Sequence, residues 1–67
     1  MNLNTKVSDN IKKFRKKLNW SQLYIATKMG MSQNNFSRIE SGQSKITCDQ
    51  IEKICNIMEI EFIKLLT

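Results

Sequence analysis

The chain has 67 residues, of which 40% are hydrophobic and 25% charged, with no proline, no histidine and a formal net charge of +5. A chain of this length predicts one small domain, residues 1–67, whose core supplies only about 3–5 kcal/mol. Nothing resembles a signal peptide, and no apolar run approaches the roughly 18 residues of a membrane span. We therefore expect a cytoplasmic protein without a membrane span. We also expect an all-α domain, because apolar residues recur at helical spacing.

The charge is distributed unevenly along the chain. Residues 1–45 carry nine Lys or Arg against two Asp or Glu, a balance of +7, whereas residues 46–67 carry two against four, a balance of −2. If the basic first part and the mildly acidic last part form opposite sides of the fold, this division favours a protein that binds a polyanion such as nucleic acid on one side. Charge that serves only solubility is the simpler alternative.

The first predicted helix begins near Asn4 or Thr5 and ends near Leu18. Apolar residues at i, i+4, i+7 and i+11 predict its buried stripe: Val7, Ile11, Phe14 and Leu18. Four lysines face away from that stripe: Lys12, Lys13, Lys16 and Lys17. They form a solvated face, or they add long-range attraction to phosphate.

The stretch from Ser21 to Gly42 predicts two short helices joined by a tight turn. Ser21 and Ser32 each suit the position that caps a helix start. Gly30 suits the end of a helix over about 22–29, where a positive φ is needed. The connector 30–32 has the length found in a helix-turn-helix, whose second helix lies in the DNA major groove.

The second of these helices carries a wholly polar face. Phe36, Ile39 and Glu40 cluster on one side, and the opposite side presents Gln33, Asn34, Ser37, Arg38 and Ser41. Gln and Asn pair with adenine N6 and N7, and Arg pairs with guanine O6 and N7. An ordinary solvated face usually carries Lys and Glu, which are absent here, so the pattern favours DNA reading.

Residues that flank this helix suit the DNA backbone. The polar loop 41–45 offers backbone N–H groups with the side chains of Gln43 and Lys45, and a plain connector is the alternative. Gln22 sits in the first turn of the preceding helix, a natural place for a phosphate contact. Leu23 and Tyr24 are expected to pack over Trp20, with a phosphate contact by the Tyr24 hydroxyl as the alternative.

The last third of the chain predicts two more helices. Thr47 followed by Gln50 fits a capping box and starts a helix from about Cys48 to Met58. Its expected core face is Ile51, Ile54, Cys55 and Met58. A short helix over about 61–66 follows. One small domain cannot cover Ile57, Phe62 and Ile63 from a single side, so these are candidates for a self-association surface, unless the C-terminus is loosely held.

The sequence argues against an enzyme and against a metal centre. Cys48 and Cys55 are seven residues apart in one helix and cannot bridge each other, and without histidine or further cysteines no zinc site is expected. Paired acids and a phosphate-cradling glycine loop are also missing. We expect no cofactor.

Taken together, these residues resemble the Xre/Cro-type helix-turn-helix family of phage repressors and bacterial regulators. The resemblance covers about residues 7–66, and its most specific pieces are Ser21-Gln22, Ala26, Gly30, Ser32-Gln33, Ser37-Arg38-Ile39-Glu40 and Gly42. It implies a compact five-helix bundle like the lambda repressor DNA-binding domain. The third helix would enter the major groove, and the C-terminal helices, about 48–66, would form a dimer.

The resemblance also implies roles for single residues. The base-reading positions are Gln33, Asn34, Ser37 and Arg38. The backbone-contacting positions are Gln22, Ser32, Asn35, Gln43 and Lys45. Arg15 and Glu40 match a salt bridge that joins the first helix to the recognition helix. The chain departs from the family pattern at Trp20, Leu23, Tyr24 and Ile63.

The function expected from these features is that of a sequence-specific transcriptional regulator, a repressor-like homodimer on a palindromic double-stranded operator. The alternative is an antitoxin or a restriction–modification controller. Such a protein would also bind a protein partner, such as a toxin, through Ile57, Phe62 and Ile63.

Overall fold

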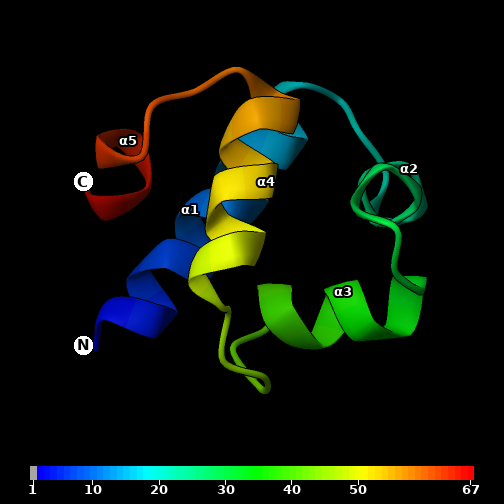
Figure 1. Ribbon diagram of the computed structural model, residues 1–67, viewed down its shortest axis with the longest axis horizontal. Coiled ribbons are helices and arrows are strands. Elements are labelled where there is room, and N and C mark those ends of the chain that lie inside the picture. The colour runs from blue at the N-terminus through cyan, green and yellow to red at the C-terminus, as the bar shows by residue number, and fades with distance from the viewer. Residues whose placement is uncertain (1) are drawn as a thin grey trace.

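The computed structural model describes residues 2–67, and every regular element in that range is an α-helix. The helices are α1 (Leu3–Lys17), α2 (Gln22–Met29), α3 (Gln33–Glu40), α4 (Cys48–Met58) and α5 (Ile63–Leu66). In Figure 1, α1 crosses behind α4, α5 lies on one side of this pair, and α2 and α3 lie on the other. The predicted all-α bundle of five helices is confirmed.

Local capping explains where the helices begin. Ser21 Oγ accepts a hydrogen bond from the backbone N–H of Tyr24 (3.0 Å), and Ser32 Oγ accepts one from Asn35 (3.1 Å). These bonds satisfy N–H groups that have no partner inside their helices. The predicted starts of α2 and α3 are confirmed, whereas α1 starts earlier than expected because Asn2 caps it.

Residues with positive φ end α2 and α4. Gly30 has φ 73° after α2, as predicted. Glu59 has φ 55° after α4, although a side chain disfavours this left-handed conformation. The predicted capping box of α4 is present in both directions between Thr47 and Gln50. The final helix is shorter than predicted and begins only at Ile63.

All five helices contribute to one core. Its fully buried members include Ile11 from α1, Ile25 from α2, Phe36 from α3, Ile54 from α4 and Leu65 from α5. Burying side chains of this size stabilises the fold by about 1.5–3 kcal/mol each.

The predictions for Leu18 and Ile57 are wrong. Leu18 is 40% exposed, because α1 ends at Lys17 and the chain then turns through Asn19 at φ 60°. Ile57 does not lie off the core face of α4, since it is half-buried and packs against the core cluster. Phe62 and Ile63 remain 49% and 53% exposed.

Two hydrogen bonds join side chains of α1 to the second half of the chain. The Asn10 side-chain amide donates a hydrogen bond to the carbonyl of Leu65 (2.8 Å). Asn4 Oδ1 accepts one from the backbone N–H of Ile46 (3.0 Å). These bonds fix the loop before α4 and the short α5 against the longest helix.

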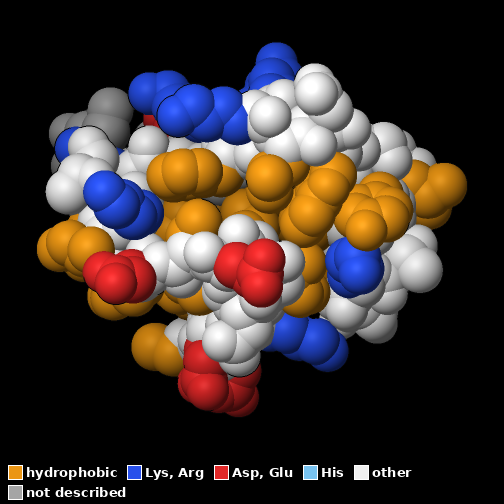
Figure 2. Space-filling model, turned by 90° about the horizontal axis from the view of Figure 1, so that it is seen from above, with side chains coloured by type: hydrophobic (Ala, Val, Ile, Leu, Met, Phe, Trp, Pro, Cys, Tyr) orange, Lys and Arg blue, Asp and Glu red, His pale blue; other side chains and the backbone are white. Residues whose placement is uncertain are grey.

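The division of charge along the sequence is not a division between two faces. The C-terminal end of α1 lies at the end of the bundle opposite α3 (Figure 1). Seen from that end, a band of hydrophobic side chains crosses the face, and Lys and Arg side chains gather along one edge of it (Figure 2). The lysines near the end of α1 therefore do not share a side with α3, which corrects the expectation of a single basic front. No helix in residues 2–67 is both long and apolar enough to cross a bilayer.

Candidate nucleic-acid interface

The polar face of α3 points away from the core. Phe36, Ile39 and Glu40 are buried on the inner side of the helix. Gln33, Asn34 and Arg38 are exposed on the outer side, Ser37 is half-buried, and Ser41 is the exposed C-cap. The outer side therefore presents amide and guanidinium groups to solvent in one row along a single helix.

An ion pair fixes α3 against α1. Arg15 donates from Nε to Glu40 Oε2 (2.8 Å) and from Nη2 to Glu40 Oε1 (2.9 Å), in the two-pronged geometry that suits a carboxylate. The side chains are only 11% and 2% exposed. Arg15 Nη1 also donates to the Trp20 carbonyl (2.7 Å), so the pair also holds the turn between α1 and α2.

Gln22 belongs to the same cluster. Its position in the first turn of α2 and the family resemblance both predict a phosphate contact, and in the structure its Nε2 donates to Glu40 Oε1 (3.0 Å). Glu40 thus receives hydrogen bonds from α1 and from α2. Sequence reasoning missed this bond, because nothing local in the sequence signals a contact between residues 18 positions apart in different helices.

The loop after α3 is held close to the exposed face. The Ser44 N–H donates to the Arg38 carbonyl and the Gly42 N–H donates to the Ile39 carbonyl, both at 3.1 Å. Gly42 has φ 84°, a conformation that favours glycine. Gln43 and Lys45 are exposed on this loop beside the end of α3 (Figure 1).

The N-terminus of α1 approaches the same loop. An open hollow of about 530 Å³ lies between them, lined by Asn2, Asn4, Thr5, Gly42, Gln43 and Lys45. Sequence reasoning did not place the first turn of α1 here, because the contact joins residues about 40 positions apart.

Comparison with known proteins identifies this arrangement. The sequence profile of the helix-turn-helix family matches residues 11–65. The chain belongs to the helix-turn-helix family. The resemblance to its Xre/Cro-type branch is thereby confirmed, and the family and fold are those of DNA-binding transcriptional regulators, which are not enzymes.

Relatives and solved structures agree with this assignment. Antitoxin PezA of Streptococcus pneumoniae serotype 4 is 33% identical over 57 residues, which are 85% of this chain and 36% of PezA. The chain thus spans about a third of the length of that relative. Two crystal structures of the clp gene regulator ClgR from Corynebacterium glutamicum superpose with TM-scores of 0.91 and 0.92 at 15% identity. They cover 98% of this chain, with 86% and 70% of the ClgR chains matched, and show the same fold.

An aromatic pair lies at the start of α2. The rings of Trp20 and Tyr24 lie 5.0 Å apart at 57°, so Tyr24 packs on Trp20 as expected. Leu23 was expected to pack as well, but it is exposed. Lys28 Nζ lies 5.1 Å from the centre of the Tyr24 ring, within the range of a cation–π contact.

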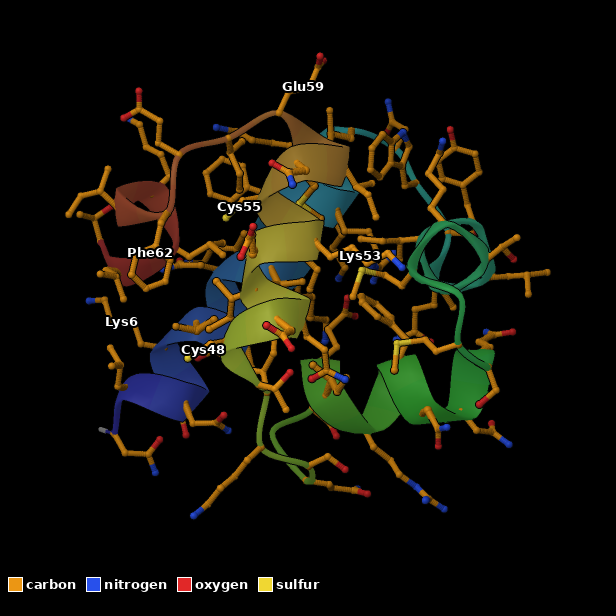
Figure 3. All side chains as sticks on the ribbon, in the orientation of Figure 1. Lys6, Cys48, Lys53, Cys55, Glu59 and Phe62 are labelled. Atoms are coloured by element: carbon orange, nitrogen blue, oxygen red, sulfur yellow. The ribbon has the colours of Figure 1, made fainter. Side chains whose placement is uncertain are left out.

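A second unusual surface lies between α4 and α5. Cys48, Cys55 and Phe62 border an open apolar groove of about 320 Å³ on the side of α4 away from α3, whereas Lys53 projects from the opposite side of the helix (Figure 3). Both cysteines are free, and burial raises the pKa of the Cys55 thiol. Within residues 2–67 no three His, Cys, Asp or Glu residues come together in a way that could hold a metal ion.

Proposed function

We propose that this helix-turn-helix protein is a sequence-specific regulator that reads double-stranded DNA by placing α3 in the major groove. The observation that carries the proposal is the division of α3 into two faces. Its inner face is buried and clamped through Glu40, while its outer face presents Gln33, Asn34 and Arg38 to solvent. A rigidly held helix with free amide and guanidinium groups is what direct reading of base edges requires.

The side chains on the outer face of α3 suit particular bases. Gln33 and Asn34 are suited to adenine, Arg38 to guanine, and Ser37 to either base. Backbone contacts come from Ser32, Asn35, Gln43 and Lys45, which lie at the start of α3 and on the loop after it. Gln22 contributes a phosphate contact through the part of its side-chain amide that does not bond to Glu40. Contacts of this kind set the register of the protein on DNA rather than its sequence preference.

The size of the domain supports a homodimer. Its principal-axis extents are 27 × 24 × 20 Å. Successive half-sites on one side of a duplex are about 34–36 Å apart, so one chain cannot reach two of them. A second copy, packed through the exposed Phe62 and Ile63, would supply the second recognition helix. Occupying a two-fold operator in this way would repress transcription.

Selection from a random-sequence duplex library at two salt concentrations tests the proposal. We expect an enriched palindrome whose half-sites are one helical turn apart. The Arg38→Ala variant should lose preference at one base pair of each half-site, whereas Lys12→Ala, which removes a positive charge from the outer side of α1, should not. Binding without enrichment that falls steeply with salt would reduce α3 to a phosphate contact and refute sequence-specific reading.

A second candidate function is that of an antitoxin or a restriction–modification controller that also holds a protein partner. The specific observation in its favour is the 33% identity to Antitoxin PezA. Sedimentation of the Phe62→Ser/Ile63→Ser double variant separates the two uses of the α5 surface. If this variant becomes monomeric, the surface serves self-association. If it stays dimeric, the surface is left for a partner. Leu3→Ser, at an exposed leucine of α1, is the control.

A further inference from the structure

A groove lined by lysines runs between α1 and α5. Its volume is about 610 Å³, and its walls are formed by Lys13, Lys16 and Lys17 of α1 and by Lys64 and Thr67 at the other side. We call this feature the lysine groove. Neither the proposed reading of DNA by α3 nor the proposed dimer contact uses it.

The lysine groove combines positive charge with an apolar floor. The floor is Phe14, which is half-buried against the core. Lys17 Nζ lies 5.8 Å from the centre of the Phe14 ring, so an ammonium group stands directly beside the apolar surface. No Asp or Glu of residues 2–67 lines the groove. Among residues 2–67 the one ion pair joins Arg15 to Glu40, so the structure pairs none of these lysines with a carboxylate.

The groove lies away from the candidate DNA-reading face. Its lysines project from the C-terminal half of α1 and from α5, and α3 lies at the other end of the bundle (Figure 1). Seen from the end opposite α3, Lys and Arg side chains border the apolar band on one edge (Figure 2). A duplex bound along α3 would leave this edge uncovered.

We propose that the lysine groove docks an acidic segment of a protein partner. Carboxylates of the segment pair with Lys13, Lys16, Lys17 and Lys64, and an apolar side chain covers Phe14. The combination selects this occupant, because a DNA backbone offers phosphates but no apolar anchor. The proposal does not depend on DNA reading by α3.

Binding of designed peptides to the full chain tests the proposal. The probe is a short, fluorescently labelled helical peptide with Glu on one face and Leu on the other. Two control peptides carry Lys in place of Glu, or Ser in place of Leu. Peptide anisotropy measures affinity, and backbone amide chemical shifts of the protein report the site. We expect binding of the Glu/Leu peptide alone, with shifts confined to the second half of α1 and to α5.

A pair of charge-matched variants tests the site. Lys13→Gln/Lys17→Gln removes two charges from the groove, and Lys12→Gln/Lys53→Gln removes two from outside it. Because each exposed ion pair contributes little, we expect Lys13→Gln/Lys17→Gln to weaken peptide binding about fivefold. We expect Lys12→Gln/Lys53→Gln to leave peptide binding unchanged. Circular dichroism checks that both variants fold.

Four results would overturn the proposal. The first is an equal loss of peptide affinity in both double variants, which would mean that the charges act without a specific site. The second is equal affinity for the peptide with Ser in place of Leu, which would mean that no apolar side chain covers Phe14. The third is displacement of the peptide by a random-sequence duplex, which would make the groove a nucleic-acid surface. The fourth is a protein dimer that the Lys13→Gln/Lys17→Gln variant abolishes, which would make a second copy the occupant.

Discussion

Breaking the Arg15–Glu40 ion pair should nearly unfold the domain. Replacing Glu40 by Leu leaves a guanidinium that is 11% exposed with only the Trp20 carbonyl, and it removes the acceptor of Gln22. Removing one partner of a buried pair costs about 3–5 kcal/mol. The whole core of so small a domain supplies about the same, so the single variants should lie near their unfolding midpoint in water.

The double variant Arg15→Met/Glu40→Leu makes the test specific. It leaves no charge unpaired in the cluster, and replacing a buried pair by apolar residues is often neutral. We therefore expect the double variant to lose much less stability than the two single variants added together, with a coupling energy of at least about 3 kcal/mol. Urea unfolding followed by circular dichroism, with sulfate added to keep the single variants folded, measures all four corners of the cycle. Additive losses, or single losses below about 1 kcal/mol, would show that the pair behaves as an exposed one and would refute the reasoning.

Four further outcomes are expected. Arg38→Ala should cost about 1–3 kcal/mol of DNA affinity at one base pair of a selected site, and a uniform loss over all sequences would make it a phosphate contact instead. Ser8→Ala should raise the melting temperature, because the Ser8 hydroxyl is buried in α1 without a hydrogen-bond partner and leaving such a group unpaired costs about 1–3 kcal/mol; a lower melting temperature would contradict this. Glu59→Gly should stabilise the fold by about 1 kcal/mol in urea unfolding, since glycine adopts φ 55° without strain, and a destabilised variant would show that this turn is not strained. With a thiol reagent near neutral pH, exposed Cys48 should react well before Cys55, whose raised pKa and partial burial leave less accessible thiolate; equal rates would count against it.

Local signals made most helix boundaries predictable. α2 and α4 have the predicted bounds because Ser21, Gly30 and the Thr47–Gln50 capping box each act within one helical turn. The start of α1 was less certain because several residues near the N-terminus can act as caps, and Asn2 does so in the structure. These outcomes depend on hydrogen bonds between residues three positions apart, which a sequence displays directly.

Contacts between helices were harder to predict. The exposed face of α3 follows from a 3.6-residue period, but the bond from Gln22 to Glu40 depends on how α2 crosses α3. Ile57 shows the same limit, since its burial depends on neighbours that its own helix period does not specify. The position of the α1 lysines in the fold could not be predicted either. A count of charges along the sequence does not say at which end of the bundle those charges lie.

The two faces of α3 also bear on how such a protein can change over time. Within residues 2–67, the side chains of Gln33, Asn34 and Arg38 are exposed and lie outside the core cluster. Exchanging such residues usually alters the free energy of unfolding by less than about 0.5 kcal/mol. Mutation can therefore explore new outer surfaces on α3 without weakening the scaffold that holds it. Duplicated copies of this domain could diverge in specificity while every intermediate sequence still folds.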